Sequence, residues 1–400
     1  MSEVGGLLLQ FKVKNYRSIG DEVVLDLTAG SGKEHSDFLI ELKKGINILP
    51  IISMYGGNAS GKSNIINAMG SMIFDVKSSH SNGERDDTRI NVNPFVFNDK
   101  LKNEPTELEM FFTVGKHEYQ YGYKTTTNKI YEEWLYRRTL SIRATKEEVI
   151  FEREGNKVVF GNKYLKSSSL LNRLKERNLA LSVLGAWNAS KMFSDIFEWF
   201  NENLHFHVNN IDYGSVKTYF ERFDGLKDSF VKFLQEFDPL IKDLAWREAT
   251  DVDGKVRMIP FSKRDKGEFH FANESEGTQR LLRIYTIFYI ALNEMRSTLV
   301  YDELDAHLHP LMLRRIVSMF HNKEINKMGS QLIFTSHNLI LLDNRELRRD
   351  EIWFVEKDER GFTNAYAMDS FKGRSDLDYL KNYLSGRFGA IPFAIAGVQK

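Results

Sequence analysis

The chain has 400 residues, 42% of them hydrophobic and 12% aromatic, which is enough apolar material for one large or two ordinary domains. Its 55 basic and 55 acidic residues balance, so no net charge draws it towards nucleic acid or an anionic membrane. The absence of cysteine excludes disulfides, thiolate zinc sites and cysteine nucleophiles, and it favours a cytoplasmic location. The most apolar stretch, residues 281–292, is interrupted by Arg283 and is too short to span a bilayer, so no membrane partner is expected.

The first segments of the chain predict strands around a phosphate-binding turn. Residues 8–14 and 22–27 alternate apolar and polar side chains, as paired strands do. Residues 48–55 form an apolar run that predicts a buried strand, and the apolar spacing from Ile65 onwards predicts a helix. Between them, Gly56-x-x-x-x-Gly61-Lys62-Ser63 lies in the strand-to-helix setting that a P-loop requires.

The chemistry of a P-loop explains these residue types. Glycines let backbone N–H groups turn inward around phosphates, and the helix N-terminus adds its positive dipole end. Lys62 can reach the β- and γ-phosphates, and the Ser63 hydroxyl can ligate Mg²⁺. The pattern predicts ATP and Mg²⁺ as cofactors, with the nucleotide-contacting residues Gly56, Gly57, Asn58, Ala59, Ser60, Gly61, Lys62, Ser63 and Asn64.

The middle of the chain changes from strand to helix patterns and back. The polar residues 77–88 predict a surface loop, and residues 167–245 carry apolar side chains at helical spacing. Period-2 segments predict an antiparallel meander over 107–114, 118–124, 129–137 and 148–153. Strand patterns return over 246–271, where residues 251–254 predict a hairpin turn. The aromatic residues Trp187, Phe193, Trp199 and Phe200 indicate either core packing or a docking surface.

Two strands in the last third end in chemically active side chains. A helix is expected over 281–292, a closing hairpin over 352–355 and 363–368, and a last helix over 376–384. The strand before Asp302 ends in two acids, of which Asp302 can hold Mg²⁺ through water and Glu303 can act as the general base towards an attacking water. The strand 331–335 leads to His337, which can stabilise the γ-phosphate charge. Each feature alone has an ordinary explanation as a turn or cap, but together they favour ATP hydrolysis.

The order of these motifs resembles that of ABC-type ATPase heads, as in SMC, RecF and OLD proteins. Three stretches, 11–18, 302–310 and 383–389, are similar to the abortive-infection ATPases of the RloA/AbiLi group. The resemblance implies an α/β ABC-type P-loop ATPase head with an antiparallel β lobe and an inserted, mainly helical lobe. It divides the chain into residues 1–160, a helical insertion at 161–245, and the rest of the head at 246–400.

The resemblance also implies further site residues. A signature formed by Ser275, Gly277 and Thr278 would contact the ATP of an opposite protomer, and Arg17 would approach phosphate. The signature reads Glu-Ser-Glu-Gly-Thr-Gln, which differs from the Leu-Ser-Gly-Gly-Gln of transporters and disfavours a transporter subunit. The glutamine loop has no clear position, because Gln120 lies within a predicted strand.

The function expected from this resemblance is slow, regulatory ATP hydrolysis in an antiphage (abortive infection) defence system. The chain would act as a nucleotide-gated regulator or sensor, partnered by itself in a dimer or higher oligomer and by a separate effector, a nuclease or RNase. The chain itself shows no nuclease motif, and His307 and His309 lack a third metal ligand. The alternative is a RecF- or SMC-like ATPase of DNA repair or maintenance, although the balanced charge does not indicate nucleic acid as a partner.

Overall fold

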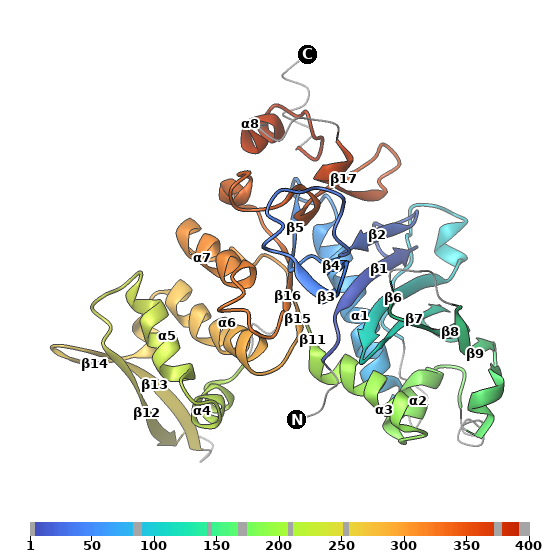
Figure 1. The fold of residues 1–400 in the computed structure, drawn as a ribbon, viewed down its shortest axis with the longest axis horizontal. Coiled ribbons are helices and arrows are strands. Elements are labelled where there is room, and N and C mark those ends of the chain that lie inside the picture. Colours follow the sequence, from blue (N-terminus) through green and yellow to red (C-terminus); the bar gives the residue numbers. More distant parts are fainter. Residues whose placement is uncertain are drawn as a thin grey trace.

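A computed structural model describes residues 5–82, 90–141, 146–166, 174–206, 211–250, 256–371 and 378–391. Two large sheets dominate it (Figure 1): a seven-stranded antiparallel sheet in the order β10-β9-β8-β7-β6-β1-β2, and a six-stranded, mainly parallel sheet in the order β11-β15-β16-β5-β17-β18. A two-stranded hairpin, β3-β4, and a three-stranded sheet, β12-β13-β14, accompany them. The strands are β1 Leu8–Lys14, β2 Val23–Asp26, β3 Ile40–Lys43, β4 Ile46–Ile48, β5 Ile51–Tyr55, β6 Thr106–Val114, β7 His117–Thr125, β8 Ile130–Thr139, β9 Glu148–Glu154, β10 Lys157–Phe160, β11 Leu204–Phe206, β12 Asp243–Thr250, β13 Val256–Arg264, β14 Gly267–His270, β15 Thr298–Tyr301, β16 Gln331–Thr335, β17 Ile352–Lys357 and β18 Thr363–Ala367. The helices are α1 Lys62–Asn82, α2 Ala180–Ala186, α3 Lys191–Glu198, α4 Tyr213–Arg222, α5 Leu226–Gln235, α6 Glu276–Asn293, α7 Pro310–His321 and α8 Tyr379–Leu384.

The parallel sheet is buried on both faces, which explains why its strands read as short apolar runs. Along β5, Ile52 and Met54 pack into one hydrophobic cluster, while Ile51 and Tyr55 pack into the other. This alternation follows from the two-residue period of a strand. The sheet therefore separates two cores, and its strand ends are the positions left for polar chemistry.

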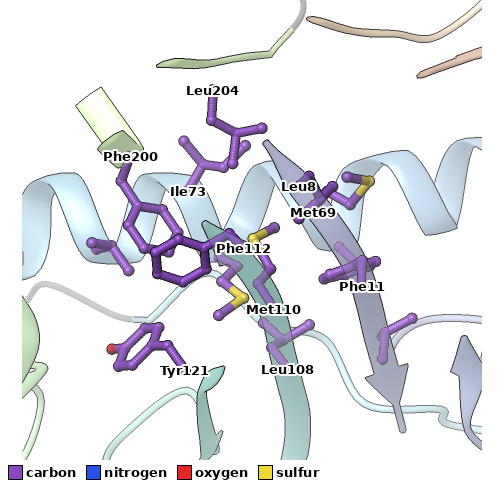
Figure 2. Close-up of a cluster of buried hydrophobic side chains, with 14 of the residues drawn as sticks. Leu8, Phe11, Met69, Ile73, Leu108, Met110, Phe112, Tyr121, Phe200 and Leu204 are labelled. Atoms are coloured by element: carbon purple, nitrogen blue, oxygen red, sulfur yellow. The ribbon is translucent and has the colours of Figure 1, made fainter. Parts of the chain in front are cut away.

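The first core joins helix α1 to the antiparallel sheet. Figure 2 shows Met69 and Ile73 of α1 beside Phe11 of β1 and Met110 and Phe112 of β6. All five side chains are at most 4% exposed. The helix that follows the P-loop is thus fixed along its length by apolar contacts with the antiparallel sheet.

The structure confirms the predicted α/β fold class with an antiparallel β lobe, and the meander of β6 to β9 is present. The predicted surface loop at 77–88 is wrong over 77–82, which continue α1. These polar residues find distant partners: Lys77 Nζ donates to the carbonyl of Asn201 at 3.0 Å, and the His80 backbone N–H donates to Ser182 Oγ at 3.0 Å. The rest of the predicted loop, and the turn at 251–254, lie outside the described residues.

The segment 161–245 is mainly helical and packs in two places. Helices α2 and α3 contribute to the core around α1, whereas α4 and α5 pack against α6 on the other side of the parallel sheet. Between them, β11 adds a parallel strand beside β15, which the helical pattern of this segment did not predict. The boundaries at 160 and 245 therefore stay a prediction.

The aromatic residues of this segment are mostly core. Phe193, Trp199 and Phe200 have no exposed surface, and the Trp199 ring stacks on Phe112 with centroids 4.2 Å apart. Only Trp187 of the four is substantially exposed, at 46%. The core interpretation is correct for the three buried residues. Among the helices of the described segments, none combines the length and apolar character needed to cross a membrane.

Candidate functional site

The P-loop connects β5 to α1, and two of its glycines are required by close packing. A Cβ on Gly56 would lie 2.1 Å from the carbonyl oxygen of Val355 on β17. A Cβ on Gly61 would lie 2.0 Å from Thr363 Oγ1 on β18, and Gly61 has φ +111°, a conformation that side chains rarely adopt. The absence of a side chain at these two positions therefore allows the loop to lie directly against β17 and β18.

Lys62 begins α1 and folds back over the loop. Its Nζ donates hydrogen bonds to the carbonyls of Gly56 at 2.8 Å and Gly57 at 3.2 Å, and the residue is 4% exposed. Burial lowers the pKa of the Lys62 ammonium, while the nearby Asp302 and Glu303 carboxylates act in the opposite direction. A buried cation at a helix N-terminus is suited to an anionic ligand.

The two acids follow β15, next to the end of β16. Asp302 Oδ1 accepts a hydrogen bond from Thr335 Oγ1 at 2.5 Å, and the same hydroxyl oxygen accepts from the backbone N–H of Glu303 at 2.7 Å. Glu303 has φ +49°, an uncommon conformation for a residue with a side chain. The Thr335 hydroxyl thus fixes both acids relative to the neighbouring strand.

His337 follows β16 and is held by the loop after the acids. Its backbone N–H donates to Asp305 Oδ2 at 3.1 Å. Because β5, β15, β16 and β17 are parallel, their carboxyl ends meet at one edge. A cavity of about 470 Å³ lies at this edge. It is lined by Asn58, Ala59, Ser60, Gly61, Lys62, Ser63, Asn64, Asp302, Glu303, His337 and Lys357.

Most of the residues expected from the sequence therefore converge, but some do not. Gly56 and Gly57 line an adjoining cavity of about 690 Å³, which shares five lining residues with the first: Asn58, Ala59, Ser60, His337 and Lys357. Arg17 lines neither cavity. It is exposed in the turn after β1 with φ +49°, and the next residue, Ser18, accepts a hydrogen bond from Asn64 Nδ2 at 2.6 Å.

The signature residues lie at the start of α6, away from the P-loop cavity. Ser275 is the N-cap: its Oγ accepts a hydrogen bond from the Thr278 backbone N–H at 3.2 Å. Gly277 packs on the loop after Glu303, since a Cβ there would lie 2.4 Å from the carbonyl oxygen of His307. Within one chain, the signature residues therefore do not line the P-loop cavity.

Several positioning residues were missed by sequence reasoning. The position of Thr335 in the sequence could have indicated its role, because Thr335 ends the strand that leads to His337. Lys357 was a weaker candidate from the sequence, because it is a basic residue at the end of another apolar strand. Thr363 gave no such indication: its Oγ1 donates to the Ser60 carbonyl at 3.0 Å across 303 residues of sequence. Contacts of this kind depend on the tertiary fold alone.

The donor set fits a magnesium nucleotide. Within the described ranges, no group of three or more His, Asp and Glu side chains is arranged to hold a metal ion by itself. The cavity nevertheless combines the Ser63 hydroxyl and the Asp302 carboxylate with a lysine at a helix N-terminus. Magnesium is commonly bound through one or two protein oxygens together with phosphates and water, so these residues suit Mg²⁺ bound with phosphates.

Comparison with known proteins gives the family. The family described as "AAA domain, putative AbiEii toxin, Type IV TA system" matches residues 51–343, which include the P-loop, both acids and His337. The chain belongs to this AAA-domain family. No curated protein matches this AAA-domain chain in sequence.

Solved structures similar to this AAA-domain protein include SMC heads. The SMC head domain from Thermotoga maritima is 16% identical with a TM-score of 0.41, covering 90% of this chain and 98% of that one. The Smc head with an extended coiled coil bound to the C-terminal domain of ScpA, from Pyrococcus furiosus, is 15% identical with a TM-score of 0.42, covering 90% and 96%.

Proposed function

We propose that this AAA-domain protein binds ATP with Mg²⁺ and hydrolyses the nucleotide slowly. The observation that carries the proposal is the convergence of Lys62, Asp302, Glu303 and His337 on one cavity at the carboxyl edge of the parallel sheet. These residues follow three different strands, whose carboxyl ends the parallel sheet brings to one edge. Clustered titratable groups in a cleft are typical of functional sites.

Each residue has a distinct task in this proposal. Lys62 and the N-terminus of α1 bind the phosphates, while Ser63 and Asp302 would hold Mg²⁺, which neutralises phosphate charge when bound. Glu303 accepts a proton from the attacking water. His337, whose backbone is held by Asp305, donates to the developing charge on the γ-phosphate oxygens.

Two substitutions separate binding from turnover. Glu303→Gln keeps the shape and hydrogen bonding of the side chain but removes the base, so ATP should bind while turnover falls by about 10²–10⁴-fold. Lys62→Ala should instead weaken binding, because the phosphates lose a buried cation. Equilibrium binding of a fluorescent ATP analogue and phosphate release measure the two effects. An equal loss of affinity in both variants would contradict the assigned roles.

We also propose that two copies of the chain form the complete site, with the signature of one copy facing the nucleotide of the other. Ser275 and Gly277 do not line the P-loop cavity of their own chain, which supports this arrangement. A Ser275→Arg chain should bind ATP and hydrolyse it poorly. Mixing it with Lys62→Ala chains should restore part of the activity. Mixed dimers, isolated through a different affinity tag on each chain, that remain inactive would overturn the arrangement.

In the cell, we propose a nucleotide-gated regulator of antiphage defence in the cytoplasm, close to the RloA/AbiLi group and acting on a separate effector. The family description, which names a putative toxin of a type IV toxin–antitoxin system, supports a defence role. Phage restriction or toxicity should then require a second, co-expressed protein, and Glu303→Gln should change it. If the purified chain cuts DNA or RNA with Mg²⁺ and Glu303→Gln abolishes the cutting, a separate effector is unnecessary.

A further inference from the structure

The backbone of Glu303 is held in its unusual conformation from two sides. Its φ of +49° is unfavourable for a residue with a Cβ and persists only where neighbouring groups enforce it. On one side, the Glu303 N–H donates to Thr335 Oγ1 at 2.7 Å. On the other, the Glu303 carbonyl accepts from Arg280 Nη2 at 2.9 Å. The direction of the Glu303 side chain therefore depends on both partners.

Arg280 lies in α6, on the helix that begins with the signature. While Nη2 contacts the Glu303 carbonyl, Nη1 donates to the carbonyl of Ala306. One guanidinium thus bridges both ends of the turn formed by residues 303–306. The planar fork of arginine suits two acceptors, and lysine offers only a point charge in its place.

Two further contacts join the first turn of α6 to the same loop. His307 Nδ1 lies 2.9 Å from Glu276 Oε2, and the His307 carbonyl lies directly against Gly277, where a Cβ would approach it to 2.4 Å. The first turn of α6 and the loop 303–307 are therefore packed as one unit. A displacement of the signature turn would therefore also displace the backbone of Glu303.

We propose that Arg280 is a positioning residue for Glu303, which couples the signature turn of a chain to the catalytic acid of the same chain. The proposal rests on the ATPase function proposed above. A nucleotide bound by the partner copy would act on the start of α6, and Arg280 would transmit that contact to the Glu303 backbone. Arg280 does not line the P-loop cavity, so its effect should be on turnover and not on binding.

The test compares Arg280→Ala with Arg280→Lys and with the matched control Arg283→Ala. Arg283 lies about one turn further along α6, and its guanidinium lies over the Tyr213 ring, 5.0 Å from the ring centroid. Arg280→Ala should lower kcat by about 10²-fold, as expected for a misplaced catalytic group, with the Kd for ATP within about twofold. Arg280→Lys should recover part of kcat, and Arg283→Ala should leave it within about twofold of the parent value.

Hydrogen exchange of the nucleotide-free protein gives a readout that does not need turnover. The Leu304 N–H donates to the Thr335 carbonyl of β16, and the Ala306 N–H donates to the Glu303 carbonyl within the loop, both at 3.1 Å. Arg280→Ala should raise exchange at these amides about tenfold or more, without raising it in α1. Thr335→Val, which removes the other support, should raise it at the same amides and serves as the second variant if Arg280→Ala does not fold.

The outcomes separate the two proposals. If the parent protein binds ATP without hydrolysing it, the proposed function fails, and the exchange data alone decide the role of Arg280. If the parent protein hydrolyses ATP and Arg280→Ala matches Arg283→Ala in both kcat and loop exchange, the positioning role is overturned. Increased loop exchange together with a lower kcat at unchanged ATP affinity supports it.

Discussion

The carboxyl group of Asp75 is buried within α1, and its ionisation should destabilise the protein. Burial raises its pKa to about 7 from a usual value of 3.8, although hydrogen bonds from Tyr123 Oη at 2.9 Å and from the Asn91 backbone favour the charged form. Each pKa unit corresponds to about 1.4 kcal/mol, so the ionised form costs the folded state about 4 kcal/mol.

The sign of the pH dependence follows from proton uptake. Between pH 4 and about 7 the folded chain keeps a proton on Asp75 that the unfolded chain releases, so this contribution to stability is greatest at low pH. It is lost as the pH rises towards the folded-state pKa. Asp75→Asn keeps a polar, uncharged side chain and should remove this loss, making the variant more stable than the parent at pH 8 by up to about 4 kcal/mol.

Urea unfolding followed by circular dichroism at pH 5 and pH 8 measures the effect. The parent and Asp75→Asn should differ by about 4 kcal/mol at pH 8 and by about 1.7 kcal/mol at pH 5, where the carboxyl is still protonated in the folded chain but already mainly ionised in the unfolded chain. Asp99→Asn is the control, since the Asp99 side chain is almost fully exposed at 98%. If the difference between the parent and Asp75→Asn is the same at both pH values, the carboxyl is not buried in the way described.

Two more predictions test packing near the site and in the core. Gly277→Ala should lower ATP turnover about tenfold or more with little effect on nucleotide affinity, as phosphate release and ATP binding would show. The new Cβ would lie 2.4 Å from the His307 carbonyl oxygen and would push the signature turn away from Glu303. Trp199→Ala should destabilise the protein by about 3–5 kcal/mol, since the ring is fully buried, whereas Trp187→Ala should have little effect at 46% exposure; unfolding midpoints compare the two.

The sequence was most informative where local pattern and tertiary position coincide. A parallel strand buried on both faces reads as a short apolar run, and its polar end residues lie where ligands bind, so the P-loop, Asp302, Glu303 and His337 could be predicted together. The predicted roles of these residues stay predictions, but their convergence on one cavity is a property of the structure.

The features that sequence reasoning missed depend on distant partners. The three residues of β11 form a strand only because Thr298 and its neighbours lie alongside, about 94 positions later in the chain. The end of α1 is polar and looks like a loop until the partners of Lys77 and His80 are known. The hydrogen bond from Arg280 to the Glu303 carbonyl could not be predicted either, because the sequence pattern shows only an arginine on an amphipathic helix.

The signature residues also stabilise structure within their own chain, so substituting them affects more than a contact with a partner chain. Ser275 caps α6, which is worth about 1 kcal/mol, so its loss disturbs the helix start even without a partner. In a mixed pair of Ser275→Arg and Lys62→Ala chains, the restored site uses the P-loop and Glu303 of the chain with the damaged signature. Random pairing of equal amounts limits recovery to about one quarter of the parent activity if signatures act only across the pair. If Arg280 also transmits the effect of Ser275→Arg to Glu303 of the same chain, the recovered activity should fall clearly below one quarter of the parent activity. Adding Arg280→Ala to the Ser275→Arg chain should then lower the recovered activity little further.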